Sequence, residues 1–271
     1  MRRKENRIEL MVAELKKDIR RLASPKKTKI YQRFFKTGKG EYGEGDLFLG
    51  LSVPQSRKIA INYKDLAFTD IKKLLKSKIH EERLIAVLIL VHRFSEKDNP
   101  PSPSADGFGE ARKEIYDFYL KHTRYINNWD LVDLSAYKIV GQYLLDQREI
   151  LKRVQDDKKR VQDDVLVRLA NSNNLWERRI SMIATFQFIK KKKEHDWTFK
   201  IAKILLNDKH DLIHKAVGWM LREVGKQCSQ EILEGFLKRH YRHMPRTMLR
   251  YAIEKFPEKL RKELFAVALA K

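Results

Sequence analysis

A tryptophan and a carboxylate share one face of a helical segment near the middle of the chain. In the segment NNWDLVD, Trp129 and Asp133 are four residues apart, which puts both side chains on the same side of a helix. The apolar residues Val132, Ala136 and Val140 continue that stripe. Two interpretations stay open: a buried aspartate with a structural partner, which the pattern alone favours, or a carboxylate held for chemistry in a partly dry cleft.

An arginine also lies on an apolar helical stripe further along the chain. In the segment NLWERR, Arg179 shares its face with Met182 and Phe186, whereas Arg178 does not. An arginine that faces inward needs an anion, either a carboxylate such as Asp133 or a phosphate. Structural pairing and phosphate binding compete evenly here.

A second tryptophan lies between two cations. In the segment HKAVGWMLRE, Trp219 is off the centre of the apolar stripe, and Lys215 and Arg222 flank it on its own face. Such a ring suits a base, a sugar or a cation–π contact, and a tryptophan packing against the next repeat is equally open. Further arginines recur at spacings that could follow phosphates: Arg239, Arg242, Arg246 and Arg250.

The overall charge predicts a polyanionic partner. The 271 residues include 58 Lys and Arg against 36 Asp and Glu, a net charge of +22, which is too basic for an ordinary metabolic enzyme. Charge alone does not choose between binding to nucleic acid, binding to an anionic membrane and a role in solubility only. One cysteine, Cys228, excludes an intramolecular disulfide and a cysteine-based zinc site, so a reducing, cytoplasmic location is expected.

The elements that must position these residues have helical periodicity almost throughout. An amphipathic helix is expected within residues 1–22, and its apolar stripe favours packing in the core over binding to a membrane surface. Ser24-Pro25 and Ser52-Val53-Pro54 each predict a helix start. Further helices are expected over residues 68–78, 80–95, 108–121, 129–145, 160–170, 175–190, 196–206, 210–225, 229–240, 245–255 and 257–269.

Repeating helix pairs define the expected architecture. The pairs recur every ~35–45 residues, the range of TPR, HEAT and armadillo repeats, and no segment alternates long enough for a strand. The sequence therefore predicts an all-α solenoid of antiparallel helix pairs, a single domain over residues 1–271 with a concave binding face. Breaker residues concentrate in loops at residues 38–45 and 98–107, and the segment VQDD occurs twice, at residues 154–157 and 161–164.

Several long segments resemble the HEAT-like-repeat DNA alkylation repair family of alkylpurine DNA glycosylases. They are FFKTGKGEYGEGDLFLGLSVPQSRKIA, NNWDLVD, LWERRISMIATFQFI, DLIHKAVGWMLREVGK and MPRTMLRYAIEKFP. The resemblance implies a basic concave face that grips duplex DNA, and hydrolysis of the N-glycosidic bond of cationic purines such as N3-alkyladenine and N7-alkylguanine. It also implies a monomer that uses no metal or cofactor.

The resemblance assigns roles to residues already singled out. Asp133 would stabilise the developing oxocarbenium ion and orient water, while Trp129 and Trp219 would stabilise cationic sugar and base. Arg179 would hold a backbone phosphate. The other expected DNA-binding residues are Lys215, Arg222, Arg246 and Arg250. A monofunctional enzyme that does not flip the base is expected; the alternatives are a non-catalytic nucleic-acid-binding helical scaffold and a protein-binding adaptor.

Overall fold

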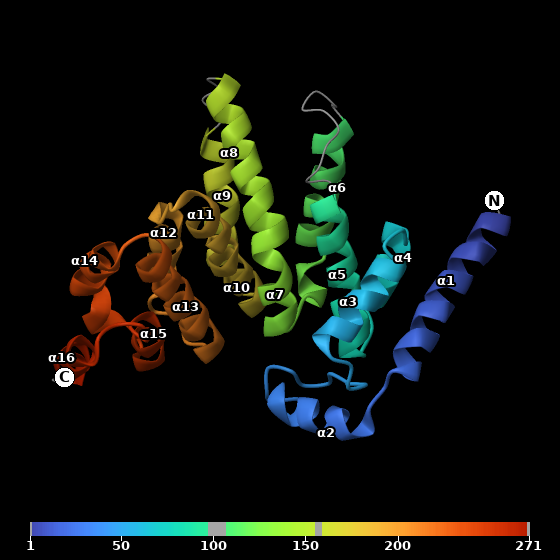
Figure 1. The fold of residues 1–271 in the computed structure, drawn as a ribbon, viewed down its shortest axis with the longest axis horizontal. Coiled ribbons are helices and arrows are strands. Elements are labelled where there is room, and N and C mark those ends of the chain that lie inside the picture. Colours follow the sequence, from blue (N-terminus) through green and yellow to red (C-terminus); the bar gives the residue numbers. More distant parts are fainter. Residues whose placement is uncertain (1, 97–106, 155–158, 270–271) are drawn as a thin grey trace. The chain divides into compact units, whose positions relative to one another are not determined.

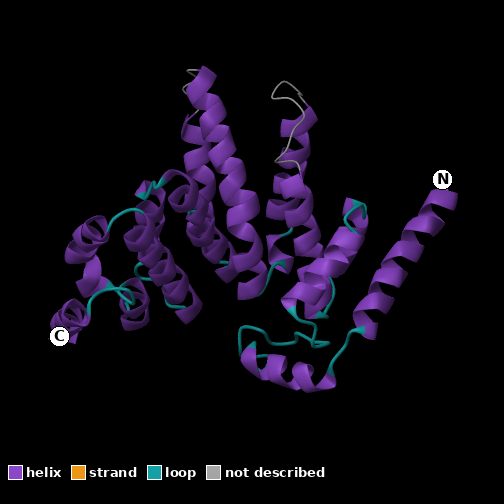
Figure 2. Ribbon diagram, viewed as in Figure 1, coloured by secondary structure: helices purple, strands orange, loops and turns teal. Residues whose placement is uncertain are grey.

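Every regular element in the described part of the chain is helical (Figures 1 and 2). The computed structural model describes residues 2–96, 107–154 and 159–269, and the side chains of residues 11–96, 109–149 and 165–265. Within these ranges the only extended pairing is a bridge between Leu47 and Ile79. The predicted all-α class is confirmed. The predicted loop at 98–107 lies, apart from Gly107, outside the described residues, as does most of the first VQDD copy.

The chain divides into two compact units, Met1–Ser135 and Ala136–Lys271. Each is described by itself, and the single domain over residues 1–271 stays a prediction. The first unit contains the following elements: α1 (Arg2–Arg21), α2 (Pro25–Phe34), α3 (Val53–Asn62), α4 (Phe68–Leu75), α5 (His80–Glu96), α6 (Gly107–Lys121), the short 3-10 turn η1 (Thr123–Tyr125) and α7 (Trp129–Ala136), which ends at the boundary.

Helix α5 forms the centre of the first unit. Its residues from His80 to Val91 are all buried, and α1, α3, α4 and α6 pack against it. Burial on all sides explains the continuous apolar run from Leu84 to Val91, since a helix surrounded by other helices needs no polar face. None of the described helices is both long and apolar enough to cross a membrane.

The second unit is built around α13 (Asp211–Gln227). Its other elements are η2 (Tyr137–Gly141), α8 (Gln142–Val154), α9 (Lys159–Ala170), α10 (Leu175–Ala184), α11 (Phe186–Lys192), α12 (Asp196–Leu205), α14 (Gln230–His240), η3 (Tyr241–His243), α15 (Arg246–Ala252) and α16 (Glu258–Leu269). Helix α13 packs against α10, α11, α12, α14 and α15. Contacts between consecutive helices are typical of a helical repeat.

Two predicted helices are interrupted where their backbones approach each other. The helix expected over 129–145 contains the π-helical turn η2 and continues to Val154, and the helix expected over 175–190 breaks at Thr185. A Cβ atom at Gly141 would lie 2.3 Å from the Ala184 carbonyl oxygen, so only glycine permits this contact. The Thr185 hydroxyl donates to the Met182 carbonyl at 2.8 Å, which locally competes with the regular helical pattern.

Candidate functional site

Trp129 is held at the first position of α7 by a side-chain cap. The Trp129 backbone N–H donates to the Asn128 side-chain oxygen at 2.8 Å. The Asn128 amide nitrogen in turn donates to Asp46 at 3.1 Å. Asn128 is fully buried, so both ends of its amide are engaged inside the protein. These bonds determine where α7 begins and therefore where the half-buried Trp129 ring lies.

A column of aromatic rings supports Trp129. Its ring stacks on Phe35 with centroids 5.1 Å apart and planes 14° apart. Phe35 stacks on Phe48 at 4.9 Å, and the His80 imidazole packs beside both rings, 4.5 Å from Phe48 and 5.1 Å from Phe35. Phe34 meets Trp129 edge-on at 5.8 Å. This column was not predicted, because its only signals in the sequence are the adjacent Phe34-Phe35 pair and Phe48 on either side of the glycine-rich loop.

His80, which packs beside the column, belongs to a buried network of charged groups. His80 Nε2 lies 2.8 Å from Asp130 and its Nδ1 lies 3.5 Å from Asp46, while Arg83 contacts Asp46 at 2.6 Å. All four side chains are buried. Burial alone would lower the pKa of His80, but Asp130 and Asp46 raise it to about 9. Burial alone would raise the pKa of Asp46, but hydrogen bonds from His80 and Arg83 bring it below its usual value.

The two aspartates of α7 have different surroundings. Asp130 belongs to the buried network, whereas Asp133, one turn after Trp129, is half-buried. Near Asp133 lies the fully buried Tyr119, whose hydroxyl is 2.8 Å from Ser135 Oγ. Burial raises the pKa of Tyr119 well above its usual range, and the Asp133 carboxylate raises it further. The carboxylate at position 133 therefore combines partial solvent contact with a buried hydroxyl pair nearby, which the sequence analysis did not predict.

Arg179 is buried on α10, as its position on the apolar stripe predicts. Its Nη1 donates to the Leu212 carbonyl oxygen in the first turn of α13 at 2.5 Å. The neighbouring Arg178 is half-buried and pairs with Asp208 at 2.6 Å. The contact from Arg179 connects α10 directly to the helix that carries Trp219.

Trp219 is half-buried on α13 and has fewer aromatic neighbours than Trp129. Its Nε1 lies 3.3 Å from Glu223 Oε1. Phe186 lies 6.3 Å from the Trp219 ring centroid and meets Tyr137 edge-on at 5.4 Å. Trp219 thus lies at the end of a loose aromatic group, and one weak hydrogen bond orients its indole nitrogen.

The two cations that flank Trp219 are paired with carboxylates. Lys215 Nζ lies 2.7 Å from Asp211, and Arg222 contacts Glu254 as well as Glu223 at 3.6 Å. Pairing within the protein reduces the positive charge that these side chains offer to a ligand.

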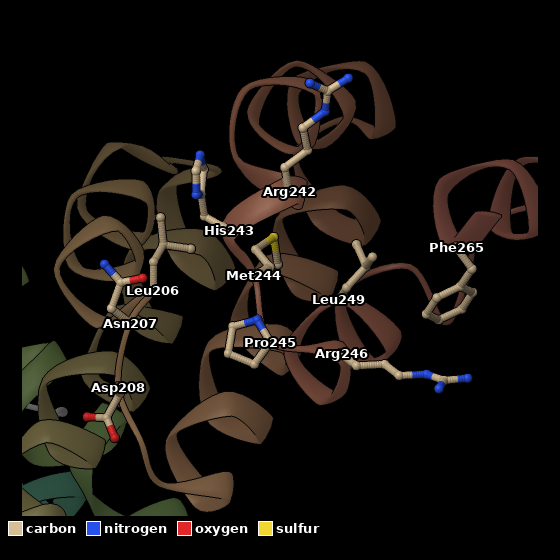
Figure 3. A pocket seen from close by; sticks show the side chains of 10 residues that line it. All are labelled: Leu206, Asn207, Asp208, Arg242, His243, Met244, Pro245, Arg246, Leu249 and Phe265. Atoms are coloured by element: carbon tan, nitrogen blue, oxygen red, sulfur yellow. The ribbon is translucent and has the colours of Figure 1, made fainter. Parts of the chain in front are cut away.

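The last two predicted DNA-binding residues, Arg246 and Arg250, are exposed on α15. Neither makes an ion pair with any residue that the structure describes. Arg246 borders a pocket of about 470 Å³ in the second unit, shown in Figure 3. The guanidinium groups of Arg242 and Arg246 point in different directions there, so they do not converge on one ligand position. The pocket is lined by Leu206, Asn207, Asp208, Arg242, His243, Met244, Pro245, Arg246, Leu249 and Phe265.

The structure thus groups the four central predicted residues into two pairs, one in each unit. Trp129 and Asp133 occupy successive turns of α7 in the first unit. In the second unit, Arg179 contacts the first turn of α13, and Trp219 lies further along the same helix.

The chain belongs to the DNA alkylation repair enzyme family, whose model matches residues 15–256. A solved structure, described as a predicted DNA alkylation repair enzyme from Enterococcus faecalis, has a similar fold. The TM-score is 0.61 over 87% of this chain and 97% of that chain, at 14% sequence identity. No curated protein matches the chain. Family membership supports a role in the repair of alkylated DNA.

Proposed function

We propose that the protein is a monofunctional DNA glycosylase. Its substrates would be cationic alkylated purines, N3-alkyladenine and N7-alkylguanine, in duplex DNA. The observation that carries this proposal is the difference between the two carboxylates of α7. Asp130 is neutralised by the buried His80, whereas Asp133 is half-buried one turn after Trp129. A half-buried carboxylate beside an aromatic ring is suited to stabilise a positively charged reaction centre.

The chemistry follows from the charge of the lesion. Alkylation at N3 or N7 makes the purine cationic and therefore a good leaving group. As the N-glycosidic bond breaks, positive charge develops on the deoxyribose. The Asp133 carboxylate would stabilise that charge and orient the attacking water. The reaction forms no covalent bond to the protein and requires no base flipping.

The aromatic residues would act on the same developing charge. Stacking on Phe35 fixes the plane of the Trp129 ring, so its π system would be oriented before the DNA binds. Trp219 would supply a second aromatic face, and Arg179 a contact to a backbone phosphate. Lys215, Arg222, Arg246 and Arg250 complete the DNA-binding residues of this proposal.

The proposal is tested by base release from a duplex that contains N7-methylguanine. Asp133→Asn keeps the size of the side chain but removes its charge, and we expect release to fall by roughly 100-fold or more. Asp196→Asn, at an exposed carboxylate on α12, is the matched control and should release the base at the wild-type rate.

Two results would contradict the proposal in different ways. Equal release by wild type and Asp133→Asn would overturn the role of Asp133. Salt-dependent binding to DNA without release by either protein would instead support the non-catalytic nucleic-acid-binding scaffold.

A further inference from the structure

Helix α2 presents an outer face that no part of the described chain covers. None of its ten residues is buried. Ile30 is 56% exposed and Phe34 is 60% exposed, which is unusual for large apolar side chains. Lys26, Lys29 and Arg33 are also exposed, and helical spacing puts them on the same side as Ile30. The outer face of α2 therefore combines cations with apolar side chains.

The cations of this face have no ion-pair partner among the described residues. Helix α2 itself contains no acidic residue. The nearest carboxylates that follow it in the sequence are engaged elsewhere, since Glu41 accepts the Gly38 N–H at 2.8 Å and Glu44 accepts the Gly40 N–H at 2.8 Å. The positive charge of α2 is therefore available to an external anion, unlike that of the paired Lys215.

The first turn of α2 is fixed by a close backbone contact. The Ser24 N–H donates to the Leu49 carbonyl at 2.8 Å. Gly50 has a φ of +85°, and a Cβ atom there would lie 2.4 Å from the Ser24 carbonyl oxygen. The buried Glu81 carboxylate accepts the Gly50 N–H at 2.7 Å and so holds this loop in place. Only glycine satisfies both the backbone angle and the contact.

The other end of α2 is fixed by the aromatic column. Phe35 follows the helix directly and stacks between Trp129 and Phe48. Phe34, the last residue of α2, touches Trp129 edge-on. The outer face is thus held rigidly and continues into the candidate site. A surface that is rigid before binding loses less conformational entropy when a ligand arrives.

We propose that the outer face of α2 is a docking surface for duplex DNA next to the candidate site. Lys26, Lys29 and Arg33 contact phosphates, and Ile30 and Phe34 contact the sugars or the base edges. A helix of about 10–12 Å diameter does not fit a minor groove of about 6 Å, but a major groove of about 12 Å admits it, so the helix faces the major groove and the phosphates that border it. This inference rests on the proposed function, because DNA supplies both the phosphates and the apolar groups.

The experiment measures binding of the full chain to a duplex that contains a tetrahydrofuran abasic analogue, by fluorescence anisotropy over a range of salt concentrations. The triple variant Lys26→Gln, Lys29→Gln, Arg33→Gln should bind at least 10-fold more weakly. The slope of log affinity against log salt should become shallower by about 2–3, because each lost phosphate contact removes about 0.9. Lys26→Arg with Lys29→Arg should keep the wild-type slope.

The matched control removes the same charge from the exposed lysines at the end of α11. It is the triple variant Lys190→Gln, Lys191→Gln, Lys193→Gln. It should change the slope by less than 1. Equal changes in the two triple variants would overturn the inference, because net charge alone would then explain both. Wild-type binding by the α2 triple variant would overturn it as well.

The apolar residues are tested separately from the charges. The variant Ile30→Ala, Phe34→Ala should weaken binding by about 5- to 10-fold and leave the salt slope unchanged, since no cation is lost. An unchanged affinity would overturn the assigned role of these two residues. If α2 instead mediates binding to phosphatidylglycerol vesicles while the duplex binds independently of α2, the surface serves a membrane and the inference is wrong.

The failure of this inference and the failure of the proposed function give different results. Asp133→Asn that still releases the base, together with weak binding by the α2 triple variant, would overturn the catalytic assignment and support the docking surface. Loss of release in Asp133→Asn, together with normal binding by the α2 triple variant, would support the catalytic assignment and overturn the docking surface.

Discussion

Trp129 and Trp219 were both predicted as site residues from the sequence, yet their neighbours in the structure support them in different ways. Trp129 stacks in parallel on Phe35, which itself packs against Phe48 and the buried His80. Trp219 lies 6.3 Å from Phe186 and makes a 3.3 Å hydrogen bond to Glu223. The plane of the Trp129 ring is therefore set by close packing, whereas Trp219 is positioned mainly by the backbone of α13.

The cations near the two tryptophans also differ, because those near Trp219 are paired with carboxylates and those near Trp129, within the part of the chain that the structure describes, are not. The cations beside Trp219, Lys215 and Arg222, are paired with carboxylates. The cations of α2, which touches Trp129 through Phe34, have no ion-pair partner among the described residues. The difference shows that a count of basic residues does not measure the charge that a helix offers to DNA.

The largest expected effect comes from removing the charge of His80, which packs against the rings that support Trp129. His80→Gln removes the cation that pairs with the buried Asp130 and leaves Asp46 with Arg83 alone. Loss of one partner from a buried ion pair costs about 3–5 kcal/mol of unfolding free energy. His92→Gln is the control, because His92 pairs with Glu96 near the surface and should contribute less than about 1 kcal/mol. Denaturant unfolding compares the two, and equal losses would show that the column does not depend on His80.

The same network predicts how stability depends on pH. The groups that face His80 are Asp46, Asp130 and Arg83. Burial and the Arg83 charge lower the pKa of His80, but Asp130 and Asp46 outweigh them and raise it from 6.5 to about 9. The folded state therefore binds this proton more tightly than the unfolded state. Its contribution is fully present below about pH 6.5 and is lost as the pH rises through about 9. His80→Gln should lack this alkaline loss, and a wild-type alkaline slope in the variant would contradict the assignment.

A smaller effect is expected where α13 approaches α15. A Cβ atom at Gly218 would lie 2.5 Å from both the Met248 carbonyl oxygen and the Tyr251 Cβ. Gly218→Ala must push the two helices apart, and we expect a loss of about 1–3 kcal/mol in thermal or denaturant unfolding. Gly235→Ala is the control, since nothing lies within 4 Å of a Cβ atom there. It should raise stability by about 0.4–1 kcal/mol through the unfolded state.

Gly218→Ala also bears on the support of Trp219, the next residue. If Trp219 is positioned by the backbone of α13, base release by the variant should fall more than its folded fraction explains. A Gly218→Ala protein that is as stable and as active as wild type would show that the approach of α13 to α15 does not position Trp219.

Periodicity was sufficient to predict most of the helices and the phase of individual residues within them. The inward position of Arg179 was predicted because an apolar stripe defines one face of a helix, whatever it packs against. The same argument placed Asp133 among apolar residues, but the structure leaves Asp133 half-buried and buries Asp130 instead. These predictions are local, since they depend on spacing within one segment.

Contacts between distant segments could not be predicted in this way. The pairs Asp46 with His80 and Phe35 with Trp129 join residues that are far apart in the sequence. Their types alone do not reveal that they meet, because every aromatic ring or carboxylate has many potential partners. The pairing of Lys215 with Asp211 is different, because these two residues are four apart on one helix and their spacing alone could have predicted the contact.

The smallest expected effect concerns that pairing. Hydrogen bonding to Lys215 brings the pKa of Asp211 below its usual value, although burial alone would raise it. Lys215→Gln should therefore move the pKa of Asp211 upward in a carboxyl titration followed by NMR. The free energy of unfolding should change by less than about 1 kcal/mol, since the pair is solvent-exposed.

The same variant measures how much charge a paired lysine offers to DNA. Each phosphate contact contributes about 0.9 to the slope of log affinity against log salt. Because Asp211 already neutralises Lys215, Lys215→Gln should change that slope by less than this value. Lys26→Gln on α2 should reach about that value. If Lys215→Gln changes the slope as much as Lys26→Gln does, a DNA phosphate must displace Asp211 from Lys215 on binding. Asp211 would then compete with the phosphate for this lysine.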